Sequence, residues 1–163
     1  MRKLVALVAG LAMLGFVNFG IWQREQLVTG GRIVLLRLSP VDPRSLMQGD
    51  YMRLNFEVAD RAFPWRSRPR RGDGHVVVGL DGQQVGHFRR IDRGGALARD
   101  EIKLRYRIRG GDAKFATNAY FFEEGQGAAF EPAQYGEFRV AEDGEMILIG
   151  LRDAGLRPLG GGG

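Results

Sequence analysis

The stretch EIKLRYRIR (Glu101–Arg109) alternates between apolar and polar residues with a period of two. Side chains in a β-strand point alternately to opposite faces of the sheet, so this pattern predicts a strand with one buried and one solvated face. The residues expected to face inward are Ile102, Leu104, Tyr106 and Ile108. The residues expected to face outward are Lys103, Arg105 and Arg107.

Other segments carry related strand patterns. The apolar run over residues 31–38 ends at Ser39-Pro40 and predicts a strand that is buried on both faces. Residues 51–58 alternate, and residues 75–80 predict a strand followed by a two-residue hairpin turn at Asp81-Gly82. Further strands are expected over residues 83–91, 113–122, 136–141 and 145–151.

The remaining segments contain few helix signals. Residues 61–74 are rich in Arg, Pro and Gly and predict an exposed basic loop, with Trp65 folding back onto the domain. Residues 128–135 allow a short helical turn, which Pro132 limits. These patterns predict an all-β fold, a compact antiparallel barrel or sandwich of seven to eight strands, preceded by one N-terminal transmembrane helix.

The N-terminal segment is expected to be a membrane anchor. Residues 4–22 carry no charge, follow Arg2 and Lys3, and end at Trp22. A helix of this length spans about 28 Å, close to the ~30 Å thickness of a bilayer core. A cleavable signal peptide needs a site of small residues, whereas bulky residues fill positions 15–22, so we expect no cleavage. A cleaved signal peptide and a buried soluble helix are the alternatives.

The anchor predicts the location and division of the chain. Basic residues before the span favour a cytoplasmic N-terminus, which places the rest of the chain on the extracytoplasmic side of the inner membrane, in the periplasm if the source is a Gram-negative bacterium. Residues 1–25 form the expected anchor, residues 26–159 an extracytoplasmic β-domain, and residues 160–163 a flexible tail. Membrane lipid around residues 4–22 is therefore one expected partner.

Charge and composition exclude several classes of function. Lys and Arg total 24 against 19 Asp and Glu, but the two signs are interleaved along the predicted strands, so we expect solvated faces and no nucleic acid partner. The chain has no cysteine, which excludes disulfides and thiolate chemistry. His75 and His87 lie on the two arms of one hairpin and could face each other, yet two histidines make a poor metal site. We expect no metal and no cofactor.

Residues 40–51 form the most distinctive segment, because prolines, Gly49 and two aspartates shape a tight bend there. Charged and aromatic residues in this segment and towards the C-terminus are the candidate binding residues. They could converge into a ligand or cation site, form a salt-bridge network, or not converge. The candidates are Asp42, Arg44, Asp50, Tyr51, Glu124, Glu131 and Arg139. Ser45 has no suitably placed lysine base, so no catalytic residue is assigned.

The segment GDYMRLNF (residues 49–56) is similar to the signature of the GDYXXLXY family of bacterial membrane-anchored proteins. Phe56 stands where the signature has Tyr, which keeps the ring without the hydroxyl and indicates packing at that position. Residues 41–46, 119–126 and 131–140 also resemble family motifs. The resemblance implies a polytopic membrane protein as partner and implies no activity.

Together these observations predict a non-catalytic interaction or accessory domain for an integral membrane partner. One alternative is a ligand-binding or hydrolytic module around Asp50, Glu124 and Arg139. Another is envelope binding through the basic residues of segment 61–71, for example to lipid head groups. The residue pattern does not indicate the oligomeric state.

Overall fold

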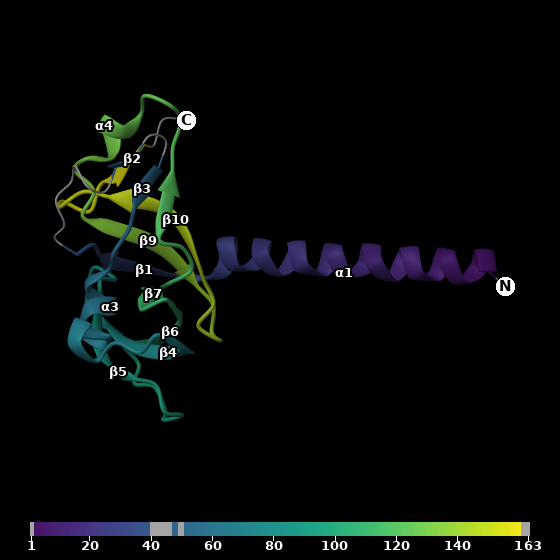
Figure 1. The fold of residues 1–163 in the computed structure, drawn as a ribbon, viewed down its shortest axis with the longest axis horizontal. Coiled ribbons are helices and arrows are strands. Elements are labelled where there is room, and N and C mark those ends of the chain that lie inside the picture. The colour runs from purple at the N-terminus through teal and green to yellow at the C-terminus, as the bar shows by residue number, and fades with distance from the viewer. Residues whose placement is uncertain (1, 40–46, 49–50, 161–163) are drawn as a thin grey trace.

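The structure, a computed structural model, describes residues 2–39, 47–48 and 51–160. The chain begins with helix α1 (Arg2–Gly30), which projects away from a β-rich domain as a single rod (Figure 1). Among the residues that the structure describes, no helix combines the length and apolar character needed to cross a membrane.

Three antiparallel sheets make up the β-rich domain. The first has the order β1-β9-β10-β11, the second β5-β4-β6-β7 and the third β2-β3-β8. The strands of the first sheet are β1 (Arg32–Arg37), β9 (Tyr135–Val140), β10 (Met146–Arg152) and β11 (Pro158–Leu159). Those of the second are β4 (Arg71–Leu80), β5 (Gly86–Ile91), β6 (Glu101–Arg109) and β7 (Asp112–Lys114). Those of the third are β2 (Met47–Gln48), β3 (Tyr51–Arg53) and β8 (Ala119–Phe121).

The sheets curl around one hydrophobic core to which strands of all three contribute. Phe138 on β9 is fully buried and meets the Phe56 ring edge-on, with 5.4 Å between the ring centroids. Strand β1 also pairs Leu35 with Val85 in an isolated parallel bridge, which connects the first sheet to the turn before β5. The domain is therefore held together by one continuous core.

The strongest strand predictions are confirmed. Strand β6 has the predicted bounds, and its apolar residues are buried while Arg105 and Arg107 are exposed. Strand β1 buries Val34, Leu35 and Leu36 in succession, as expected for a strand with two covered faces. The hairpin of β9 and β10 and a short helix, α4 (Gly127–Phe130), also lie where the sequence predicts them.

The predicted strand over residues 51–58 is correct in its burial and wrong in its secondary structure. Met52, Leu54, Phe56 and Val58 are all buried. Strand β3 nevertheless ends at Arg53, and helix α3 (Glu57–Ala62) begins four residues later. Glu57 and Arg61 form an ion pair one helical turn apart, at 2.6 Å, which supports the short helix.

Turns account for the other differences. The connection from β4 to β5 contains five residues, 81–85, rather than a two-residue turn, and Gln84 adopts a φ of 63° within it. Ala116 (φ 53°) interrupts the expected strand over residues 113–122, leaving β7 and β8. Eleven strands occur within the described residues instead of seven to eight, because one predicted strand is divided and two short strands, β2 and β11, lie outside the predicted ones.

The segment 61–74 is also more ordered than an exposed loop. It contains the end of α3, a 3₁₀ turn η1 (Trp65–Ser67) and the start of β4 at Arg71. Trp65 is 84% exposed, so the expectation that it folds back onto the domain is wrong. Helix α1 continues to Gly30, past the predicted boundary at residue 25, and residues 161–163 of the predicted tail lie outside the described chain.

Replacing Phe138 with Ala should destabilise the fold by about 3–5 kcal/mol, because it opens a cavity at the centre of the core. Chemical denaturation of the full chain in detergent, followed by circular dichroism, measures this change. The matched control is Phe121→Ala, which removes a ring that is 73% exposed and should cost less than about 1 kcal/mol. Equal losses for the two variants would contradict this assignment of the core.

Candidate functional site

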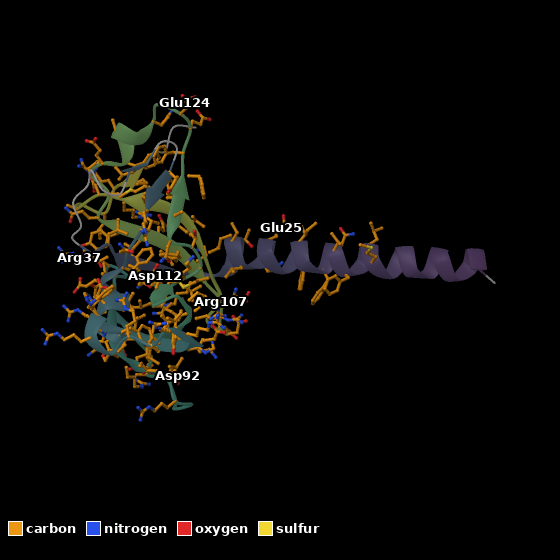
Figure 2. All side chains as sticks on the ribbon, in the orientation of Figure 1. Glu25, Arg37, Asp92, Arg107, Asp112 and Glu124 are labelled. Atoms are coloured by element: carbon orange, nitrogen blue, oxygen red, sulfur yellow. The ribbon has the colours of Figure 1, made fainter. Side chains whose placement is uncertain are left out.

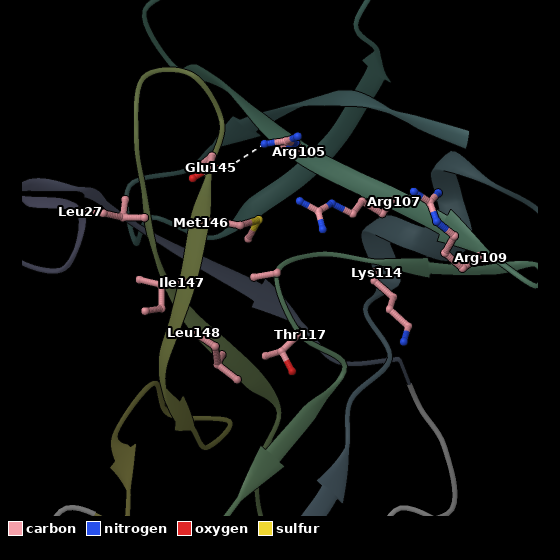
Figure 3. Close-up of a pocket in the computed structure, with 11 residues that line it drawn as sticks. Leu27, Arg105, Arg107, Arg109, Lys114, Thr117, Glu145, Met146, Ile147 and Leu148 are labelled. Carbon is pink, nitrogen blue, oxygen red and sulfur yellow. Dashed lines mark hydrogen bonds and ion pairs between the residues drawn. The ribbon is translucent and has the colours of Figure 1, made fainter. Parts of the chain in front are cut away.

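A groove of about 570 Å³ opens between strands β6 and β7 on one side and β10 on the other, beside the end of α1 (Figure 3). One wall is basic and comes from β6 and β7. The other wall is largely apolar and comes from β10 and from Leu27 of α1. We call this feature the basic groove, and its charged residues are Arg105, Arg107, Arg109, Lys114 and Glu145.

The alternation of β6 creates the basic wall. Arg105, Arg107 and Arg109 are two residues apart and share the outward face, and Lys114 on β7 is the cross-strand neighbour of Arg107. Arg105 pairs with Glu145 at 2.7 Å. Within the described part of the chain, the side chains of Arg107 and Lys114 make no hydrogen bond and no ion pair.

The carboxylate of Asp73 on β4 interacts with the positive charges of the basic wall. Arg109 donates two hydrogen bonds to its carboxylate, at 2.8 and 2.9 Å. The hydrogen bond from Arg109 lowers the pKa of Asp73, and the charges of Arg109, Arg107 and Arg105 act in the same direction, against the effect of desolvation. Three arginines therefore stabilise the ionised form of one carboxylate, because each of them lowers its pKa.

The apolar wall consists of Leu27, Met146, Ile147 and Leu148. The three β10 side chains are partly buried, and Ile149 beyond them is 40% exposed. In Figure 3, the β10 ribbon lies between Leu27 and the arginines, and the Met146 side chain points from β10 toward Arg107. A ligand in the groove would therefore meet cationic groups on one side and hydrocarbon on the other.

The end of α1 is fixed against the first sheet next to this groove. Nη1 of Arg139 on β9 donates a hydrogen bond of 3.0 Å to the carbonyl oxygen of Gly31, just beyond the last helical residue. A cation at a helix C-terminus also interacts favourably with the helix dipole. A Cβ atom at Gly31 would lie 2.5 Å from the carbonyl oxygen of Leu27, so only glycine fits there.

The structure places the predicted binding residues in separate regions. Arg139 lies at the α1 junction. Glu124, labelled in Figure 2, and Glu131 are both exposed, one before α4 and the other directly after it. Across the described ranges, no hydrogen bond or ion pair connects either glutamate to Arg139. Three other candidates, Asp42, Arg44 and Asp50, and with them Ser45, lie outside the described residues, so their convergence stays a prediction.

Tyr51 lies at the start of β3, opposite Phe121 on the edge strand β8. The two rings are tilted at 39° with their centroids 5.7 Å apart. Phe121 is 73% exposed, and large apolar side chains at this level of exposure are typical of contact surfaces when they cluster. We call Tyr51 and Phe121 the edge aromatic pair.

The two histidines do not face each other. His87 lies opposite Gly79 in the β4–β5 pairing, and its Nε2 atom is 3.2 Å from Oδ2 of Asp81. His75 is the cross-strand neighbour of Arg105 on the other side of β4. The hairpin therefore does not bring the two rings together, although the sequence allowed it.

The basic segment 61–71 lies around α3, on the side of the β-domain away from α1 (Figure 1). Arg61 pairs with Glu57, and Arg68 pairs with Asp60 at 3.0 Å. Part of its charge is thus compensated within the domain.

These features define a mostly β protein in which antiparallel sheets curl around one core and a long N-terminal helix is fixed to the first sheet. The chain belongs to the GDYXXLXY protein family, which it matches over residues 13–151. No curated protein and no solved structure matches the chain.

The family signature has a clear structural meaning at the positions described. Leu54 and Phe56, its sixth and eighth residues, are at most 1% exposed and belong to the core. This agrees with the expectation that the aromatic ring at position 56 serves packing. Tyr51 contributes instead to the edge aromatic pair.

The basic groove was not predicted from the sequence, because the outward face of residues 101–109 has the pattern of a solvated strand face. A usable signal was present: Arg105, Arg107 and Arg109 share one strand face without an acidic residue between them. The apolar wall could not be deduced, since Leu27 and residues 146–148 are more than a hundred residues apart in the chain.

Replacing Gly31 with Ala should lower stability by about 1–3 kcal/mol, because the added methyl group meets the Leu27 carbonyl oxygen and the Arg139 side chain. Thermal unfolding of the full chain in detergent measures the effect. Gly30→Ala is the matched control, since no atom lies within 4 Å of the added Cβ and alanine favours the helix. An equal effect of both substitutions would contradict the tight junction.

Proposed function

We propose that this protein is a single-pass membrane protein whose N-terminal helix holds a non-catalytic interaction domain against an integral membrane partner. The observation that carries the proposal is the exposed apolar surface of α1. Helix α1 projects away from the β-domain (Figure 1), and its large apolar side chains from Met13 to Trp22 are exposed, with Phe16 80% and Met13 72% exposed. A continuous apolar surface of this kind is unfavourable in water and has to be buried against another apolar phase. Lipid is the environment that suits the uncharged stretch over residues 4–22.

The orientation in this proposal follows from the flanking charges. Arg2 and Lys3 before the apolar stretch favour a cytoplasmic N-terminus, so the β-domain lies on the extracytoplasmic side of the inner membrane. Helix α1 passes directly into β1 through Gly31. The domain is therefore held close to the surface, where confinement raises its effective concentration towards a membrane partner.

The edge aromatic pair supports the contact with a protein partner. Strand β8 is the last strand of its sheet, and an edge strand has backbone groups free to pair with another chain. Phe121 adds an exposed aromatic ring at this edge, and aromatic residues are enriched at the centres of protein interfaces. We assign the partner contact to this edge of the domain.

Extraction of native membranes with alkaline carbonate tests the anchor. The wild-type chain should remain in the membrane pellet, with an N-terminus that precedes Trp22. The double variant Leu14→Arg/Val17→Arg should move to the supernatant, because each arginine at a span centre costs about 2.5–3.5 kcal/mol. The control Leu14→Ile/Val17→Ile keeps the stretch apolar and should stay in the pellet. Release of the wild-type chain would refute the anchor.

Site-specific photo-crosslinking in native membranes tests the partner contact. With p-benzoylphenylalanine in place of Phe121, we expect one crosslinked product, an integral membrane protein with several spans identified by mass spectrometry. The control position is Arg93, which is exposed and adjoins Asp92 at the end of the domain opposite Glu124 (Figure 2). No product at Phe121, or the same product from both positions, would contradict the assigned contact.

A further inference from the structure

The basic groove concentrates positive charge at a defined place on the domain. Four basic residues line it against one acidic residue, Glu145. Arg107 and Lys114 are cross-strand neighbours, and neither has an ion-pair partner among the residues described. On its other side Arg107 faces Asp73 of β4, but that carboxylate is held by two hydrogen bonds from Arg109. Positive charges therefore outnumber negative ones here, and an anion between Arg107 and Lys114 would reduce their mutual repulsion.

The position of the groove relative to α1 restricts the source of such an anion. Leu27 lines the groove and lies five positions after Trp22, which is about 7.5 Å along a helix axis. The head-group layer outside a bilayer core is about 5–8 Å deep on each side. With residues 4–22 in the hydrocarbon, the groove therefore lies at the level of the lipid head groups. Figure 2 shows Arg107 on the side of the domain from which α1 projects.

The two walls fit the two parts of a phospholipid head region. Arginine and lysine donate charge-assisted hydrogen bonds to phosphate oxygens, and the guanidinium of Arg107 can do so with two N–H groups. Met146 and Leu148, which project from β10 on the side of the arginines (Figure 3), offer hydrocarbon to the glycerol backbone and the first methylene groups. Free inorganic phosphate would leave this apolar wall uncovered.

We propose that the basic groove binds the phosphate of an anionic phospholipid, with Arg107 and Lys114 as its charged contacts and the β10 wall against the glycerol backbone. This inference rests on the proposed function, because the anchor sets the height of the groove. A bound lipid also fixes the rotation of the β-domain about the axis of α1, since it contacts the domain on one side of the helix.

Native mass spectrometry of the detergent-solubilised full chain tests the lipid site directly. The protein is incubated with equal amounts of phosphatidylglycerol and phosphatidylcholine, and the retained lipids are counted. Wild-type protein should retain phosphatidylglycerol in preference. The variant Arg107→Gln/Lys114→Gln should bind it about 30-fold more weakly, from about five-fold per basic residue removed. The charge-conserving variant Arg107→Lys/Lys114→Arg should retain most of the binding.

The matched control is Arg37→Gln/Arg66→Gln, which removes two exposed charges outside the groove. Arg37 lies on the side of the domain opposite α1 (Figure 2), and neither residue has an ion-pair partner within the described ranges. This control should bind phosphatidylglycerol like the wild-type chain, and circular dichroism should show all variants folded. Equal weakening by both double variants would overturn the site. Displacement of the lipid by millimolar inorganic phosphate would overturn it in favour of a free-phosphate site.

Failure of this inference can be distinguished from failure of the anchor. Carbonate extraction depends on α1, so Arg107→Gln/Lys114→Gln should remain in the membrane pellet. A chain that stays in the pellet without selecting phosphatidylglycerol would refute the lipid site alone. A wild-type chain that selects the lipid in detergent but is released by carbonate would refute the anchor alone.

Discussion

Strand β9 is the element on which the rest of the structure depends, because its two faces connect the core to the helix. Phe138 points into the core against Phe56. The neighbouring residues point the other way: Glu137 accepts hydrogen bonds from β10, and Arg139 donates one to Gly31 after α1. With β1 on one side and β10 on the other, one short strand fixes the relation between helix, sheet and core.

Burial could be predicted from the sequence better than backbone conformation. The alternation in β6 predicted both its bounds and its buried face, because a long period-two pattern is compatible with little else. The same pattern over residues 51–58 identified the buried residues and still missed α3. Leu54, Phe56 and Val58 reach the core although the chain changes from strand to helix between them, since a turn of helix can bury Val58 as well as a strand can.

The site could be predicted less well, because its parts meet only through tertiary pairing. Arg139 was grouped with carboxylates on the basis of charge, whereas it lies at the end of α1, where its hydrogen bond is to a backbone oxygen. The basic groove needs β7 beside β6 and β10 across from them, and no local pattern encodes that arrangement. What the sequence did contain was the uninterrupted charge on one face of β6.

The direct passage from α1 into β1, with Gly31 too crowded for any side chain, has a consequence for self-association. In the proposed membrane-anchored arrangement, every copy inserts with the same end of the helix, so all copies point in one direction. Two-fold axes lying in the membrane plane are then forbidden, and only rings about an axis perpendicular to the bilayer are allowed. If copies of this protein associate, their symmetry must be cyclic. The surface of each β-domain that contacts its neighbours must then lie around the membrane normal and not at the end of the domain furthest from the membrane.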